Sequence, residues 1–173
     1  ADGQIDWGEL EQTTRSATRF LDSSVGNAFW PVERIRERTQ LYRNIGLGVM
    51  GWADMLILLG IPYDSEEVVQ LGEQVMKFIN DTADDESRQL GGGQRKNTTV
   101  TSIAPTGSIS LLAGCSSGIE PLFGIVTVKN TYVGSFHNVH WAFEHIAHER
   151  GFYSEDLLGE ITRTGSIQHL AEV

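Results

Sequence analysis

The stretch Thr99-Val-Thr-Ser-Ile-Ala-Pro-Thr-Gly-Ser-Ile-Ser110 carries the most information about fold and chemistry in this sequence. Residues 98–103 are rich in β-branched side chains and predict a strand. Pro105-Thr-Gly107 predicts a turn, and residues 108–113 predict a short helix. The stretch therefore predicts a strand that passes through a glycine turn into a helix.

This strand–turn–helix pattern suits the binding of an anion. The first N–H groups of a helix have no partner within the helix, and the helix dipole adds partial positive charge there. Gly107 lets an anion approach the backbone, and the neighbouring hydroxyl groups add donors. We predict a phosphate-binding loop made of Ala104, Pro105, Thr106, Gly107, Ser108, Ile109 and Ser110. On the local pattern alone, a simple turn with a helix cap stays open as the alternative.

Two familiar glycine-rich nucleotide motifs are absent from the sequence. The spacing G-x-x-x-x-G-K-[ST] of a P-loop does not occur, and Gly46-Leu-Gly48 lacks the third glycine of a dinucleotide-binding fingerprint. Gly46 and Gly48 instead predict a close approach of another backbone to the short apolar segment 45–49.

Outward from this stretch, helix and strand patterns alternate along the chain. Asp6 and Ser154 are candidate N-caps, Gly26 and Gly60 are candidate helix ends, and the helix that Gly60 ends is so apolar that we expect it to be buried on several sides. Helices are predicted over residues 6–25, 31–40, 52–59, 65–90, 140–150 and 154–164, and strands over residues 98–103 and 125–128. Residues 45–49 are either a buried strand, which we favour, or the start of the following helix. The alternation predicts an α/β fold that is rich in helix.

Composition narrows the classes of partner. The 173 residues carry a formal net charge of −10, which argues against nonspecific binding to a nucleic acid polymer but allows one local nucleotide pocket. The longest apolar run is far shorter than the ~20 residues that a membrane span needs, and no secretory signal is visible. We expect a cytoplasmic protein without a membrane partner. The chain starts at Ala1 rather than Met, so we expect a fragment or a processed product.

Several polar residues outside the loop are candidates for function. Cys115 is the single cysteine, so no internal disulfide is possible, and we expect it to be a small buried residue rather than a nucleophile. Asp54 lies in an apolar helix and needs a hydrogen-bond partner. Glu120 is either a general acid or base or a structural carboxylate. Arg95 and Lys96 are more typical of solvated loop charges than of phosphate ligands.

The histidines do not have the spacing of a metal site. His137, His140, His145 and His148 lie close together in sequence, but the order H-E-x-x-H is absent. We expect surface histidines and no metal site.

Beyond these local patterns, the sequence resembles the large catalytic subunits of ribonucleotide reductases. IAPTGSIS at 103–110, followed by LLAGCSSGIEPLFG at 111–124, is very similar to the substrate-phosphate loop of that family and the segment after it. RNIGLGVMGWADMLILLGIPYDSEE at 43–67 resembles an earlier segment, and residues 2–22 and 149–170 resemble flanking regions in the same order. The resemblance thus covers nearly the whole chain, which is far more specific than one short motif.

The resemblance implies a fold and a reaction. It implies part of a ten-stranded α/β barrel that spans residues 1–173 and takes part in the reduction of a ribonucleotide 2′-hydroxyl by a thiyl radical, a step in deoxyribonucleotide synthesis. Residues 104–110 would hold the substrate phosphates. The segment GCSSGIEPLFG is most similar to the corresponding segment of the adenosylcobalamin-dependent branch. The implied partners are the ribonucleotide and the remainder of the reductase polypeptide, and a homodimer would add a second copy of the subunit.

The sequence also departs from the family. The family's radical cysteine lies in an Asn-x-Cys-x-Glu motif upstream of the segment that matches Ala1, and neither this motif nor the paired redox cysteines occur here. No catalytic residue is therefore expected in this chain. Residues 91–97 form a shorter connection than the family usually has, and Gly91-Gly-Gly93 predicts a flexible loop or an engineered junction.

A second hypothesis belongs to a different class of protein. A barrel portion without the chemistry can be a binding or self-assembling module, because open strand edges invite pairing. An upstream Asn-x-Cys-x-Glu in the same reading frame would favour the reductase, whereas a start codon near Ala1 would favour the module.

We predict that these 173 residues alone do not reduce a ribonucleotide, because the cysteines that carry the radical and the reducing electrons are missing. The check is a turnover assay of the purified chain with CDP or CTP, adenosylcobalamin and a dithiol. Formation of deoxyribonucleotide above a protein-free blank would contradict this prediction.

Overall fold

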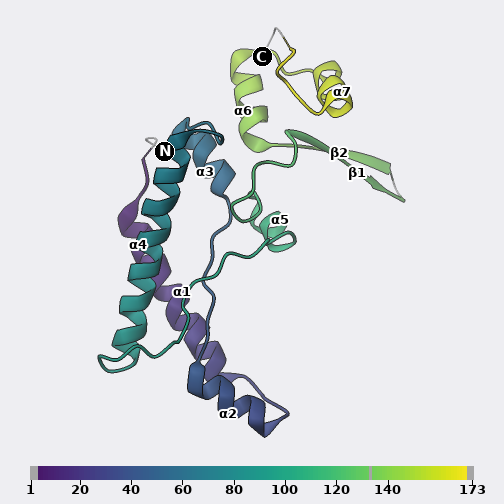
Figure 1. The fold of residues 1–173 in the computed structure, drawn as a ribbon. Coiled ribbons are helices and arrows are strands. Elements are labelled where there is room, and N and C mark those ends of the chain that lie inside the picture. The colour runs from purple at the N-terminus through teal and green to yellow at the C-terminus, as the bar shows by residue number, and fades with distance from the viewer. Residues whose placement is uncertain (1–3, 133, 171–173) are drawn as a thin grey trace. The chain divides into compact units, whose positions relative to one another are not determined.

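The computed structural model describes residues 4–132 and 134–170, which form two compact units that divide between Glu120 and Pro121. The first unit contains the helices α1 to α5, and the second contains the strands β1 and β2 with the helices α6 and α7 (Figure 1). The fold is helix-rich, as the sequence predicts. None of the described helices is both long and apolar enough to cross a membrane.

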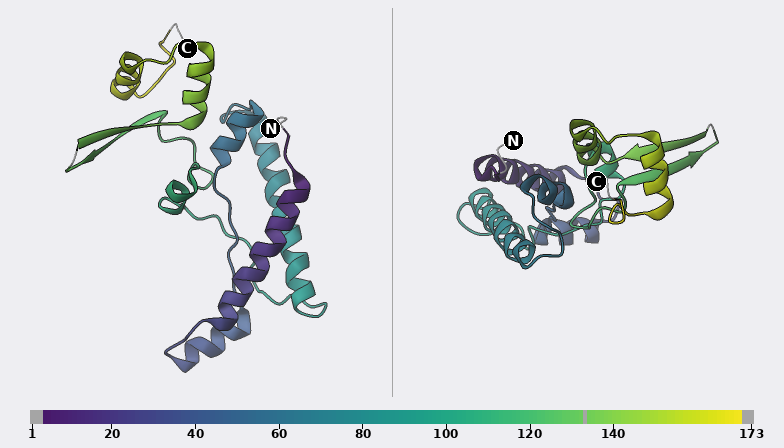
Figure 2. Two further views of the ribbon diagram at one scale, coloured as in Figure 1. Left: turned by 180° about the vertical axis from the view of Figure 1, so that it is seen from behind. Right: turned by 90° about the horizontal axis from the view of Figure 1, so that it is seen from above.

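Two long helices lie side by side in the first unit. They are α1 (Trp7–Asn27) and α4 (Glu66–Leu90), which pack against one another and cross at an angle in the left view of Figure 2. The predicted N-cap of α1 is confirmed, because the Asp6 side chain accepts a hydrogen bond from the Glu9 N–H at 2.9 Å. Gly26 does not end α1, which continues to Asn27, and the chain then turns into α2 (Glu33–Tyr42).

The helix α3 (Trp52–Leu59) joins the core of this unit. Trp52 and Leu56 pack against Val75 and Ile79 of α4, and Gly60 ends α3 in the left-handed conformation, as predicted. The apolar sequence of α3 predicts burial on several sides. Leu58 is 54% exposed instead, because the described residues cover only one side of the helix.

The segment 45–49, which precedes α3, runs parallel to the segment 98–103, which precedes the predicted phosphate loop. The Leu47 N–H donates to the Val100 carbonyl at 2.8 Å, and the Ser102 N–H donates to the Leu47 carbonyl at 2.9 Å. The segments 45–49 and 98–103 are therefore paired, but the prediction that each is a strand is wrong. They form a single parallel bridge rather than a ladder, since the Ile45 N–H bonds to Thr99, one residue out of register.

Gly48 explains how these two segments come so close. A Cβ atom at Gly48 would lie 2.3 Å from the Ser102 carbonyl oxygen, and one at Gly46 would lie 3.0 Å from the Ser102 Cβ. The predicted close backbone approach is confirmed. Any side chain at Gly48 would push the two segments apart.

A buried carboxylate fixes the chain just before the segment 98–103. Asp22 of α1 accepts hydrogen bonds from Arg43 at 2.8 Å, from Lys96 at 2.9 Å and from Asn97 at 3.0 Å. Asn97 is wholly buried and also bonds to the Ser87 hydroxyl at 2.8 Å. Burial opposes ionisation of Asp22, but these hydrogen bonds outweigh it and lower the pKa of its carboxyl from 3.8 to about 2.

A second buried carboxylate joins the two long helices. Glu86 of α4 is 2% exposed and bonds to Arg19 at 2.6 Å and to Arg15 at 3.3 Å, both from α1. Two cations on one buried carboxylate compensate for its loss of hydration.

Backbone hydrogen bonds hold the glycine-rich loop between α4 and the segment 98–103 against the end of α4. The Gly91 N–H donates to the Ser87 carbonyl at 3.1 Å, and the Gly93 N–H donates to the Arg88 carbonyl at 2.9 Å. A Cβ at Gly91 would lie 2.0 Å from the Gln94 carbonyl oxygen. These hydrogen bonds describe a tight turn; that the loop is shorter than in the family stays a prediction.

The second unit packs a hairpin against two helices. β1 (Val126–Thr131) and β2 (Gly134–Val139) are antiparallel, with Val126 opposite Val139, and α6 (Trp141–Arg150) and α7 (Glu155–Thr164) follow. Its core is formed by Val126, Phe143, Ala147, Leu157, Leu158 and Ile161. The Ser154 cap is confirmed by a 3.2 Å hydrogen bond from the Leu157 N–H. The second strand was not predicted.

We predict that Asp22→Asn lowers the free energy of unfolding by roughly 3 kcal/mol at neutral pH, near the lower end of the cost of breaking a buried ion pair, because Lys96 is partly hydrated. The stabilisation from Asp22 is complete above its unfolded-state pKa near 3.8 and is lost as the pH falls through about 2. Urea unfolding should therefore show the difference from wild type shrinking between about pH 5 and about pH 2.5.

The matched control is Asp81→Asn, which breaks an exposed ion pair with Lys77 on α4 and should leave the free energy of unfolding almost unchanged, because water screens the pair. Equal losses in the two variants, or a loss at Asp22 that does not change with pH, would contradict the assigned network.

Candidate functional site

The predicted phosphate loop is an exposed turn between the extended segment 98–103 and α5 (Ile109–Ala113). Thr106 is half-buried, and Ser110 is the one buried member at 1% exposure. α5 has only five residues, so its dipole is small, and the local backbone matters more than the helix as a whole.

The loop presents a row of unused backbone donors. The N–H groups of Thr106, Gly107, Ser108 and Ile109 have no acceptor within the described residues. Thr106 has a left-handed backbone (φ 52°), whereas Ser108 is right-handed (φ −91°). Successive N–H groups in such mixed conformations form a concave site for an anion. The described part of the chain thus leaves four adjacent donors available for a ligand.

Thr106 is held in an unfavourable conformation by one contact. A β-branched residue at positive φ is a true outlier and costs of order 1–3 kcal/mol. Its hydroxyl accepts a hydrogen bond from the Gly118 N–H at 2.7 Å. This bond fixes the turn, so the Thr106 hydroxyl serves the loop itself rather than a ligand.

Ser110 is engaged in a similar way. Its hydroxyl lies 3.0 Å from the Ser117 hydroxyl, and its carbonyl accepts from the Cys115 N–H at 3.0 Å. Of the three hydroxyl groups predicted as phosphate donors, two therefore contact the segment 115–118. Ser108 is exposed, and its hydroxyl is not engaged in this way.

Gly118 was not identified from the sequence, yet the loop depends on it. It has φ +49°, and a Cβ atom there would lie 2.9 Å from the Ala104 carbonyl oxygen. Only glycine therefore allows the segment 115–118 to lie against the loop. The usable signal was the pair of glycines in Gly114-Cys-Ser-Ser-Gly118.

Asp54 has the partner that its burial predicts. Its carboxylate accepts a hydrogen bond from the Ser116 N–H at 2.6 Å, and its own N–H donates to the Ser116 hydroxyl at 3.4 Å. The expectation that Asp54 has a hydrogen-bond partner is confirmed, and this partner is a backbone N–H. Asp54 thereby joins α3 to the segment that contacts the phosphate loop.

Cys115 lies beside this contact. It is half-buried, and burial together with the negative charge of Asp54 raises the pKa of its thiol. A raised pKa keeps the sulfur protonated at neutral pH and makes it a poor nucleophile. This environment supports the interpretation of Cys115 as a packing residue.

The remaining candidates do not gather at the loop. Arg95 pairs with Asp84, and Lys96 pairs with Asp22 at 2.9 Å, so neither is a free loop charge. Glu120 is exposed. No three His, Cys, Asp or Glu side chains are placed to hold a metal ion in the described ranges, and the side chain of His137 lies outside them.

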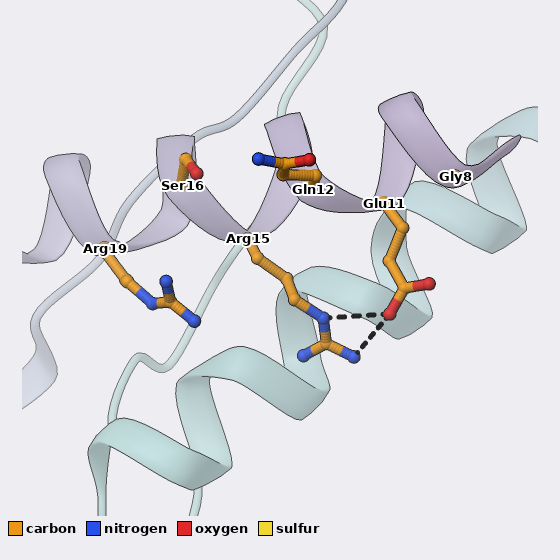
Figure 3. A pocket seen from close by; sticks show the side chains of 6 residues that line it. All are labelled: Gly8, Glu11, Gln12, Arg15, Ser16 and Arg19. Carbon is orange, nitrogen blue, oxygen red and sulfur yellow. Dashed lines mark hydrogen bonds and ion pairs between the residues drawn. The ribbon is translucent and has the colours of Figure 1, made fainter. Parts of the chain in front are cut away.

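A separate pocket lies along one face of α1 (Figure 3). Arg15 points toward Glu11 and bonds to it at 3.0 Å, and it also bonds to Asp85 at 2.8 Å. Arg19 is paired with Glu86. Both guanidinium groups are already neutralised, so this pocket offers no cation to a ligand. Its lining residues are Gly8, Glu11, Gln12, Arg15, Ser16 and Arg19.

Comparison with known proteins places the chain in a family. The family described as "Ribonucleotide reductase, barrel domain" matches residues 1–96 and 91–173. The two matches meet in the glycine-rich loop, where the sequence predicts a shortened connection. Together they cover the whole chain.

Individual relatives agree with the family match. A vitamin B12-dependent ribonucleoside-diphosphate reductase of Thermoplasma acidophilum is 42% identical over 96% of this chain, and one of Mycobacterium tuberculosis is 40% identical over 97%. The chain spans about a quarter of these relatives, 24% and 27% of their lengths.

A solved structure shows the same fold. The class Id ribonucleotide reductase alpha subunit of Actinobacillus ureae matches with a TM-score of 0.79 and 28% identity, over 92% of this chain and 32% of that one. By family match, by relatives and by fold, this chain belongs to the ribonucleotide reductase barrel-domain family.

Proposed function

We propose that this chain is the substrate-phosphate-binding part of a ribonucleotide reductase catalytic subunit. The observation that carries the proposal is the row of four backbone N–H groups, Thr106 to Ile109, that have no acceptor among the described residues. Gly107, Ser108 and Ile109 are exposed, so an anion can reach these donors, and adjacent N–H groups in one turn form a concave anion site. The phosphates of a nucleotide supply the oxygen acceptors.

Backbone donors also explain how an acidic chain binds an anion. The net charge is −10, and the loop 104–110 contains neither Lys nor Arg. The nearest cations in sequence, Arg95 and Lys96, are paired with carboxylates. Oriented N–H dipoles provide local positive potential without a charged side chain, as they do at other phosphate sites.

We propose a ribonucleoside diphosphate as the substrate. The relatives from Thermoplasma acidophilum and Mycobacterium tuberculosis are named as ribonucleoside-diphosphate reductases. Four donors in one turn match the several oxygens of a terminal phosphate group. In this arrangement Gly107 lets the phosphate reach the backbone, and Ser108 contributes its hydroxyl.

The chemistry itself is assigned to the rest of the full-length protein. We propose that the complete subunit forms the ten-stranded α/β barrel and reduces the 2′-hydroxyl by thiyl radical chemistry, with cysteines from outside these residues. The same relatives are named as vitamin B12-dependent, which supports adenosylcobalamin as the source of the radical. No residue of this chain is assigned to the cofactor.

The binding test is a calorimetric titration of the chain with CDP and CTP. We predict saturable binding that is lost in the double variant Gly107→Val, Ser108→Ala, because the valine covers the backbone donors and the alanine removes the free hydroxyl. A Cβ at Gly107 would meet no atom within 4 Å, so the substitution should leave the fold intact. Cytidine, which has no phosphate, is the ligand control.

Two results would oppose the proposal. Equal binding of CDP by the wild type and the double variant would show that the phosphate binds elsewhere on the chain. Equal binding of CDP and cytidine would show that the base or the ribose, rather than the phosphate, is recognised.

A second candidate function is favoured by one observation. Leu111 and Leu112 of α5 are 74% and 92% exposed, and Leu58 of α3 is also open. Exposed apolar groups of this size mark surfaces that associate. They support a self-assembling module, or contact with the remainder of the barrel.

We predict that the isolated chain self-associates and that Leu111→Ser, Leu112→Ser shifts it toward monomer, because the change removes the most exposed apolar groups of α5. Sedimentation velocity over a range of concentrations is the measurement. Val69→Ser, at a 69% exposed position on α4, is the matched control. A wild-type chain that stays monomeric at high concentration would rule out the module.

A further inference from the structure

We infer that Asp54 is a positioning residue for the phosphate loop, acting through Ser116, Gly118 and Thr106. Asp54 lies 50 residues before the loop begins and on a different element, so no local pattern connects them. The inference rests on the proposed function for its meaning, since the loop that Asp54 positions is the proposed phosphate site. The contacts themselves can be tested without a ligand.

The first step is the contact between α3 and the segment 115–118. Asp54 is only 7% exposed, and its carboxylate receives the Ser116 N–H at 2.6 Å. Ser116 in turn accepts at its carbonyl from the Gly51 N–H at 2.8 Å. The hydroxyl of Ser116 accepts the Asp54 N–H at 3.4 Å. Ser116 therefore both caps the start of α3 and is held by it.

The same segment supplies a further acceptor to α3. The Trp52 N–H donates to the Gly118 carbonyl at 3.4 Å. The first N–H groups of a helix have no partner inside the helix, so they are free to bind another segment. The start of α3 thus orients the peptide groups of residues 116–118 from two sides.

The second step is the contact between this segment and the loop. The Gly118 N–H donates to the Thr106 hydroxyl at 2.7 Å, and Ser117 lies 3.0 Å from Ser110. Thr106 is the strained residue of the loop, with φ 52°. A strained turn persists only where its surroundings hold it. The Gly118 amide is the group that holds Thr106, and its direction is set from α3.

The third step is the rigid support behind Asp54. α3 is packed through Trp52 and Leu56 onto Val75 and Ile79 of α4. Its backbone is therefore part of the core of the unit, whereas the loop is exposed. A carboxylate that accepts from a backbone N–H makes a stronger bond than a neutral acceptor does. Through Ser116 and Gly118, Asp54 connects the rigid core to Thr106 and so fixes the direction of the four free N–H groups of the loop.

The experiment compares Asp54→Asn with Asp64→Asn. Both remove one negative charge, but Asp64 is exposed in the turn after α3. Exchange of individual backbone amides is followed by NMR in the chain without ligand, and CDP affinity is measured by calorimetry. Asp54→Asn should speed exchange at both Ser116 and Gly118 and weaken CDP binding about tenfold, as loss of a charged hydrogen bond does. Asp64→Asn should change neither.

The amide of Gly118 decides the inference, because it does not contact Asp54 through its N–H. Faster exchange at Ser116 alone, with Gly118 unchanged, would overturn the positioning role. If the wild-type chain does not bind CDP, the proposed function fails, while the exchange at Gly118 still decides whether Asp54 holds the loop.

A second pair of variants covers the case in which Asp54→Asn does not fold. Thr106→Val removes the hydroxyl that Gly118 binds and keeps the side-chain shape, whereas Thr106→Ser keeps the hydroxyl. Thr106→Val should speed exchange at Gly118 and weaken CDP binding, and Thr106→Ser should restore both. Equal behaviour of the two variants would contradict the contact on which the inference depends.

Discussion

The pairing of residues 45–48 with residues 99–102 determines where everything else in the first unit lies. It brings two backbones together at Gly48, where no side chain fits. On one side of this pairing, Asp22 gathers Arg43, Lys96 and Asn97. On the other side, Asp54 holds Ser116. The phosphate loop lies between these anchors in sequence, so a buried carboxylate fixes the chain before it and another fixes the chain after it.

Both anchors are buried acidic residues with a structural role. Part of the chain's negative charge therefore stabilises the fold. Asp22, Glu86 and Asp54 are buried and engaged, and the basic residues near them are used in pairing. Little basic charge is therefore available in this region to bind an anion through side chains. The free N–H groups of the loop are the complementary solution, because backbone dipoles bind an anion without adding a cation.

Local features could be predicted from the sequence, and non-local ones could not. The caps at Asp6 and Ser154 depend on residues three positions away, and both were found. The strands at 45–49 and 98–103 were predicted from residue type, but a ladder also needs register, which slips at Ile45. In the site, the phosphate loop was predicted from its local pattern and by resemblance, and it stays a prediction. The contact of Thr106 with Gly118 was missed, because the glycines of residues 114–118 indicate a turn but not the loop that this turn contacts.

The most direct test of the central claim is an amide NMR titration of the chain with inorganic pyrophosphate. The account predicts that the N–H signals of Thr106, Gly107, Ser108 and Ile109 shift downfield together and saturate with one dissociation constant, because these donors gain an anionic acceptor. Saturating shifts at Arg15 and Arg19 on α1, with the four loop signals unmoved, would contradict it.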